Sequence, residues 1–223
     1  MCIDSEIVLT EILSTNIVDV VIEFATMKNA NIAFERNVIW IMANLCRCPP
    51  LLLDRIVSLL PVFNAALLAS DTEILIEALN GITRVEEKSI KLAMQYINFE
   101  RVLYFLTTED EDVKCAAIKA IGGLCFGSDE AITKLLRTNL LQSIKEILKN
   151  SKNVDLLQSV CWTLSNIAFG PKEHVQALID SGLFPLLCEI IESSAASIAF
   201  FAINFLGQKR IHLDLSECCD KSR

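Results

Sequence analysis

The sequence contains the pattern Trp-x-x-x-Asn twice, once at Trp40 and Asn44 and again at Trp162 and Asn166. The two tryptophans are 122 residues apart, which corresponds to three periods of about 41 residues. A chain with such a repeat folds as an array of similar units, because one unit cannot bury its apolar face without a neighbour. Only 7 Gly and 5 Pro occur among 223 residues, so long helices joined by short loops are favoured over a sandwich or barrel of short strands.

Weaker copies of the pattern place further Trp-equivalent positions at Glu77, Lys119 and Phe201. The five positions are 37, 42, 43 and 39 residues apart, a spacing typical of armadillo and HEAT repeats. An apolar segment with helical spacing precedes each position, over residues 8–24, 56–69, 93–106, 135–148 and 177–191. Each repeat is therefore predicted to contain a short helix, a longer helix and a third helix that carries the Trp-equivalent position.

These patterns predict an all-α fold, an armadillo-repeat right-handed superhelical solenoid. It would hold about five repeats over residues 1–207 and would be partial at both ends. Residues 208–223 are polar and charged, and we expect them to form a disordered tail. Alternation of apolar and polar residues is not sustained anywhere, so no strands are predicted.

The net charge of the chain is −8, from 20 Lys and Arg and 28 Asp and Glu. This balance argues against a nucleic-acid partner, because phosphate binding needs an excess of basic side chains. An acidic surface favours basic partners, although the charge could also serve solubility alone. The apolar runs are too short for a membrane span, and no basic segment precedes the first of them as a secretory signal would require.

The nine cysteines include no Cys-x-x-Cys pair and have no His pair nearby, so no metal site or cofactor is expected. The thiols are expected to be free, as in a reducing compartment. The chain has two histidines, His174 and His212, and no catalytic triad, phosphate-binding glycine loop or His-Glu-x-x-His motif. The sequence therefore predicts a protein that is not an enzyme.

Asn37, Trp40 and Asn44 lie on one stripe of the predicted third helix. A carboxamide can donate to and accept from the backbone of an extended peptide. An indole face can hold the aliphatic stem and ammonium group of a lysine. The alternative is that each Trp is half-buried structure and each Asn is a local cap, but a pair repeated at one repeat position favours a shared binding surface.

Three segments resemble the importin-α family of armadillo-repeat proteins. Residues 35–47, ERNVIWIMANLCR, are similar to its fourth repeat, and residues 159–170 are similar to its seventh. Residues 180–187, DSGLFPLL, resemble the turn into the second helix of a repeat in that family. The resemblance covers roughly residues 5–207. It implies a concave groove of third helices that binds basic nuclear localisation signals, in the cytoplasm and the nucleus.

The resemblance implies a role for each candidate residue. Trp40 and Asn44 would form the last rung of the major signal-binding site, and Trp162 and Asn166 would belong to the minor site. In the fifth repeat the register is open by about three residues. One alignment puts Glu73 and Glu77 on acidic positions of the family and leaves Asn80 where a Trp belongs, although these acids could equally be a solvated helix edge. The candidate peptide-binding residues are Asn37, Trp40, Asn44, Glu73, Glu77, Lys119, Asp129, Trp162, Asn166 and Phe201.

The sequence also departs from the family's pattern at positions that bear on signal binding. Gly123 and Phe205 stand where Asn would be, Phe201 stands for a Trp, Lys119 for an Arg, and Ser159 for an acid. The basic segment that recruits importin-β has no counterpart, so we expect this chain alone not to recruit importin-β. One hypothesis is an adaptor module with reduced signal binding. The other is an armadillo scaffold that has lost signal binding, and either could have partial end repeats whose apolar faces are covered by a partner or by association.

Overall fold

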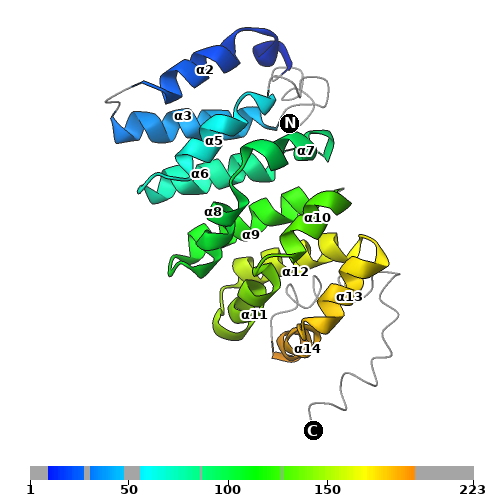
Figure 1. Ribbon diagram of the computed structural model, residues 1–223. Coiled ribbons are helices and arrows are strands. Elements are labelled where there is room, and N and C mark those ends of the chain that lie inside the picture. Colours follow the sequence, from blue (N-terminus) through cyan, green and yellow to red (C-terminus); the bar gives the residue numbers. More distant parts are fainter. Residues whose placement is uncertain (1–9, 28–30, 48–55, 86, 127, 194–223) are drawn as a thin grey trace. The chain divides into compact units, whose positions relative to one another are not determined.

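The computed structural model describes residues 10–27, 31–47, 56–85, 87–126 and 128–193 (Figure 1). Every element of the described chain is helical, which confirms the predicted all-α class, and no strand occurs among these residues. None of the described helices is both long enough and apolar enough to cross a membrane. The Trp-equivalent Phe201 and the predicted tail at residues 208–223 lie outside the described residues.

The elements are α2 (Ile17–Ala25), α3 (Ile32–Leu45), α5 (Leu60–Ala66), α6 (Thr72–Thr83), α7 (Glu87–Tyr96), α8 (Phe99–Tyr104), the 3₁₀ helix η2 (Phe105–Thr107), α9 (Glu111–Cys125), α10 (Asp129–Leu136), α11 (Leu140–Asn150), α12 (Val154–Ala168), α13 (Lys172–Asp180) and α14 (Phe184–Ser193).

The chain divides into two compact units, with the boundary between Val102 and Leu103 inside α8. The first unit contains the third helices α3 and α6, which pack against each other along their length (Figure 1). The second unit contains the third helices α9 and α12, which pack in the same way. The predicted single solenoid over residues 1–207 stays a prediction.

All four third helices begin at an N-cap whose side-chain oxygen accepts a backbone N–H from the first turn. These side chains satisfy donors that a helix start leaves unpaired. Successive caps are 40, 39 and 43 residues apart, so the capping residues repeat with the helices. The caps are Asn31, Asp71, Asp110 and Asn153.

The caps fix the register that the sequence left open in α6. Trp40, Lys119 and Trp162 each lie nine residues after the N-cap of their helix. Nine residues after Asp71 comes Asn80, whereas Glu77 comes only six residues after it. The alignment that puts Asn80 at the Trp-equivalent position is therefore the one that matches the structure. Glu77 then has the same register in α6 as Asn37 has in α3, six residues after the N-cap.

Close packing between neighbouring helices depends on small residues. Gly81 of α6 faces the fully buried ring of Phe63, and a Cβ at Gly81 would overlap that ring. Gly122 of α9 faces the ring of Trp162 in the same manner. The buried hydroxyl of Thr163 donates to the Ile118 carbonyl oxygen at 3.0 Å, which joins α12 to α9 without an unpaired polar atom.

Candidate functional site

A groove of about 330 Å³ lies between the third helices α3 and α6 of the first unit. One wall is Arg36, Asn37 and Trp40 from α3, and the other is Glu73, Ile76 and Glu77 from α6. Four of the sequence-predicted site residues, Asn37, Trp40, Glu73 and Glu77, thus come together in one place. The groove combines an aromatic surface, a carboxamide and two carboxylates, which are groups that bind cations and peptide backbone.

Trp40 is the largest side chain of this groove, and 54% of its surface is exposed. The neighbouring carboxamides are anchored to their own helix: Asn37 Nδ2 donates to the Ala33 carbonyl oxygen at 2.8 Å, and Asn44 Nδ2 donates to the Trp40 carbonyl oxygen at 2.9 Å. These bonds fix the two side chains on the helix surface. In the described part of the chain no residue donates to either carboxamide oxygen, so both oxygens are open to a ligand.

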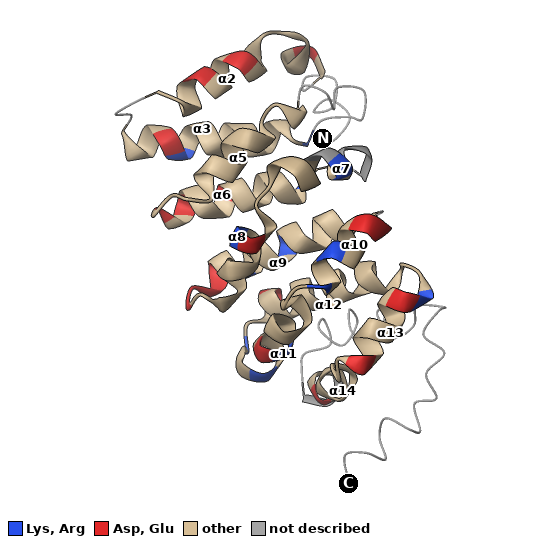
Figure 2. Ribbon diagram, viewed as in Figure 1, with Lys and Arg blue, Asp and Glu red and all other residues tan. Residues whose placement is uncertain are grey.

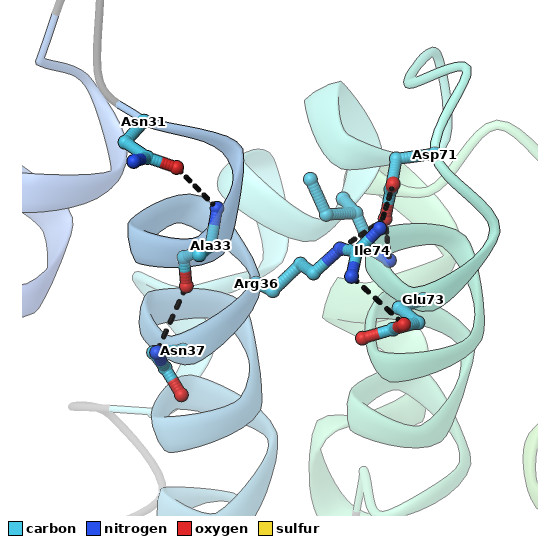
Figure 3. A network of polar contacts seen from close by, with 7 residues as sticks. All are labelled: Asn31, Ala33, Arg36, Asn37, Asp71, Glu73 and Ile74. Carbon is cyan, nitrogen blue, oxygen red and sulfur yellow. Dashed lines mark hydrogen bonds and ion pairs between the residues drawn. The ribbon is translucent and has the colours of Figure 1, made fainter.

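Arg36 joins the two walls of the groove (Figure 3). Its Nε and Nη2 donate to the two carboxylate oxygens of Asp71 at 3.0 and 2.7 Å, and its Nη1 donates to Glu73 Oε1 at 2.8 Å. Asp71 also accepts the backbone N–H of Ile74 as the N-cap of α6. The hydrogen bonds from Arg36 hold the pKa of the Asp71 carboxyl below its ordinary value, and the same pair raises the pKa of Arg36. A bidentate Arg–carboxylate pair is among the stronger polar contacts in proteins.

The two glutamates of the groove have different surroundings. The Glu73 side chain is 66% exposed, but its carboxylate is already paired with Arg36. Glu77 is partly buried and makes no hydrogen bond or ion pair with any described residue, although it interacts electrostatically with Arg84. In Figure 2 acidic positions mark the first turns of α3 and α6, and a basic position adjoins the acidic one on α3. Of the two carboxylates that line the groove, that of Glu77 is the one that forms no ion pair with a described residue.

Side chains thirteen residues after the N-cap tie neighbouring third helices together. Arg84 Nη1 donates to the Ala43 carbonyl oxygen of α3 at 2.7 Å. In the second unit, Asn166 Nδ2 donates to the Gly122 carbonyl oxygen of α9 at 2.9 Å. Both acceptors belong to the last turn of their helix, where carbonyl groups lack a helical partner. Burial lowers the pKa of Arg84, and the charge of Arg47 lowers it further.

The second unit presents its Trp–Asn pair differently. Trp162 is half-buried, with its ring directly over Gly122, and the Asn166 amide is engaged with the same residue. Lys119 is exposed on α9 in the register of the Trp position. Asp129 is exposed at the first residue of α10, next to Gly170 and His174. Asp129 therefore lies beside the α13 start, on an element other than the third helices.

Sequence reasoning missed two residues of the site, Arg36 and Arg84. Arg36 neighbours Asn37 in the sequence, but nothing local indicates that it reaches Asp71. Arg84 could have been found once α6 was aligned by its N-cap, because it then takes the position of Asn44 and Asn166. No cluster of three or more His, Cys, Asp and Glu side chains that could hold a metal ion occurs among the described residues.

The sequence is similar to importin-α subunits of plants. Importin subunit alpha-1a of Oryza sativa subsp. japonica is 22% identical over 160 residues, which cover 70% of this chain and 30% of that protein. Importin subunit alpha-4 of Arabidopsis thaliana is 21% identical over 171 residues, or 75% and 32% of the two chains. The chain thus spans about a third of the length of these curated relatives. No family model matches the chain.

Solved structures show the same fold. A designed armadillo-repeat protein in complex with the peptide (KR)4 has a TM-score of 0.83 and 18% identity, with 92% of this chain and 85% of that chain covered. An engineered protein has a TM-score of 0.81 and 22% identity, with 91% and 82% covered. The predicted armadillo-repeat solenoid and the resemblance to importin-α are both confirmed. The chain has the armadillo-repeat fold and is a divergent relative, in sequence, of importin-α subunits.

Proposed function

We propose that this chain binds basic segments of partner proteins, of the nuclear-localisation-signal type, through the groove between α3 and α6. The observation that carries the proposal is that the exposed indole of Trp40 and the carboxylate of Glu77, which forms no ion pair with a described residue, line one open groove. The indole can hold the alkyl stem of a lysine or arginine, and the carboxylate can neutralise its charge. The acidic net charge of −8 would draw such segments toward the chain.

The fold of the chain and its similarity to importin-α subunits support a role as a protein-binding adaptor in nuclear import. The residues proposed to take part are Asn37, Trp40, Asn44, Glu73 and Glu77 in the first unit. In the second unit they are Lys119, Asp129, Trp162 and Asn166, with Phe201 outside the described residues. The proposed location is the cytoplasm and the nucleus, and the proposed activity is binding without catalysis.

A scaffold that contacts partners without reading localisation signals is the second candidate. It is favoured by the second unit, where Trp162 covers Gly122 and Asn166 bonds the Gly122 carbonyl oxygen. Side chains committed to packing between repeats are less free to hold a peptide. The two candidates differ in whether binding of a peptide depends on its basic side chains.

Titration of a fluorescent bipartite basic peptide, followed by anisotropy, tests the proposal. The peptide is compared with a Lys→Ala version, and the protein is compared with Trp40→Ala, Trp162→Ala and Phe169→Ala variants. Phe169 is 73% exposed and lies outside the groove, so its truncation controls for loss of exposed aromatic surface. We expect saturable micromolar binding, about −8 kcal/mol or weaker, that Trp40→Ala abolishes and Phe169→Ala preserves. Equal binding by the Lys→Ala peptide would contradict signal recognition and favour the scaffold.

A further inference from the structure

We infer that the α3–α6 groove accepts one basic side chain per ligand, that Glu77 receives its charge, and that Arg36 sets this limit by occupying Glu73. The inference rests on the proposed function and specifies its ligand as a segment with an isolated Lys or Arg at this groove. It assigns Arg36 as the residue that determines specificity. It also assigns different roles to Glu73 and Glu77, which the sequence pattern does not distinguish.

Arg36 fills the place that a second ligand cation would need. Its guanidinium group makes three hydrogen bonds to carboxylate oxygens, two to Asp71 and one to Glu73 (Figure 3). A ligand amine that approached Glu73 would meet a carboxylate that already accepts from a donor tethered to the protein, at Oε1, and would have to share its charge with that donor. A tethered donor has the advantage, because a free ligand must lose more freedom of motion to form the same contact.

Arg36 is held in place mainly by Asp71 and does not depend on Glu73 alone. Two of its three hydrogen bonds go to Asp71, which is only 16% exposed in its side chain and caps α6 through the Ile74 N–H. Moving Arg36 away would break a bidentate pair and leave the capping carboxylate with one partner fewer. The positive charge of Arg36 therefore stays in the groove and disfavours a second cation there.

Glu77 has the opposite surroundings. Its carboxylate lines the groove with Trp40 and forms no hydrogen bond or ion pair with the described residues. Arg84, which interacts with it electrostatically, points its Nη1 at the Ala43 carbonyl oxygen instead. A ligand cation that lies on the Trp40 ring would meet this partly buried carboxylate, where solvent screening is weaker than at the exposed Glu73.

The charges predict the spacing of the ligand's basic residues. In an extended peptide, side chains two positions apart point to the same face, so residues i and i+2 would enter the same groove. With Arg36 in place, Glu77 is the groove carboxylate that forms no ion pair with a described residue, and the second basic residue of a Lys-x-Lys pair would meet Glu73, which Arg36 already contacts. Neutral side chains at the positions two before and two after the bound Lys are therefore preferred.

The test uses two fluorescent peptides with neutral backgrounds, one with a single Lys and one with Lys-x-Lys, measured by anisotropy. The matched variants are Glu73→Gln and Glu77→Gln, which remove one carboxylate each and leave the Arg36–Asp71 pair intact. For the single-Lys peptide we expect Glu77→Gln to weaken binding ~tenfold and Glu73→Gln to change it by less than about threefold. Wild-type protein is expected to bind the two peptides within about twofold of each other.

Equal losses from Glu73→Gln and Glu77→Gln would overturn the inference and leave the proposed function standing. Tighter wild-type binding of the Lys-x-Lys peptide by ~tenfold would also overturn it. Absence of saturable binding by either peptide to wild-type protein would overturn the proposed function as well. A third variant, Arg36→Gln, is expected to give the Lys-x-Lys peptide the advantage that wild type denies it, with circular dichroism establishing that the variant is folded.

Discussion

The side-chain amide of Asn166 donates to the carbonyl oxygen of Gly122, while the equivalent amide of Asn44 donates within its own helix to Trp40. The two asparagines occupy the same register, thirteen residues after an N-cap. They differ because α12 packs on an earlier third helix, α9, whereas no third helix precedes α3 among the described residues. The same register position thus joins neighbouring third helices at Asn166 and Arg84, whereas at Asn44 it bonds only within its own helix.

Substitution of Asn166 by Ala should destabilise the protein, whereas Asn44→Ala should not. Asn166→Ala leaves a carbonyl oxygen in the last turn of α9 without its donor, and the expected loss is about 1 kcal/mol of unfolding free energy. Asn44→Ala removes only a bond to its own helix and gains helix propensity, so the expected change is within about 0.5 kcal/mol. Urea denaturation of the two variants provides the comparison. Equal losses of unfolding free energy in the two variants would contradict the role of Asn166 in joining α12 to α9.

Arg84→Met should cost more than a surface arginine substitution. Methionine retains most of the aliphatic stem but cannot donate to the Ala43 carbonyl oxygen, a charge-assisted bond of 2.7 Å at the end of α3. We expect a loss of about 1.5–3 kcal/mol. Arg137→Met is the matched control, because Arg137 is exposed at the end of α10, and it should change stability by less than about 0.5 kcal/mol.

Much of the fold could be predicted from the sequence because structural repeats produce a detectable sequence period. The spacing of Trp40 and Trp162 and the helical pattern of apolar residues are sufficient for the all-α solenoid. The capping residues Asp71 and Asn153 also recur at the repeat spacing, and aligning them would have fixed the register of α6 at Asn80. Sequence periodicity reflects burial, and burial is what the repeats share.

The site was less accessible to sequence reasoning because it depends on contacts between repeats. Trp40 and Trp162 have the same motif, but one is 54% exposed and the other lies half-buried over Gly122. The pairing of Arg36 with Asp71 spans 35 residues and has no local signature. Motifs therefore predicted which residues lie on the third helices. They did not predict which of these side chains already bond to other parts of the protein and which remain open to a ligand.

Gly122→Ala should destabilise the protein although alanine is the better helix former. A Cβ at this position would overlap the Trp162 ring and come within 2.6 Å of the Thr163 hydroxyl. Overpacking of this kind costs about 1–3 kcal/mol, more than the roughly 1 kcal/mol that alanine gains in helix propensity. The double variant Gly122→Ala with Trp162→Leu should recover part of the loss in urea denaturation, because the smaller side chain makes room. Additive losses would argue against direct contact.

His174 should make the stability of the second unit depend on pH. Its ring is buried, Nε2 lies 2.8 Å from the Thr133 hydroxyl, and Nδ1 has no partner among the described residues. Burial lowers the pKa of His174 below its ordinary value, and the nearby carboxylates of Asp129 and Glu173 oppose this shift without reversing it. The folded state therefore binds this proton less readily than the unfolded state does. The stabilisation from neutral His174 is complete above the unfolded pKa near 6.5 and is lost as the pH falls through the lower folded value.

Unfolding free energies measured between pH 7.5 and 5.5 should therefore decrease in wild-type protein. The decrease should shrink in His174→Gln, which retains an amide able to reach Thr133 but does not titrate. Asp71 and Glu111, whose pKa values are lowered by their hydrogen bonds, lose their stabilising charge only below their ordinary values near 4, outside this window. A slope that survives in His174→Gln would assign the pH dependence to another group.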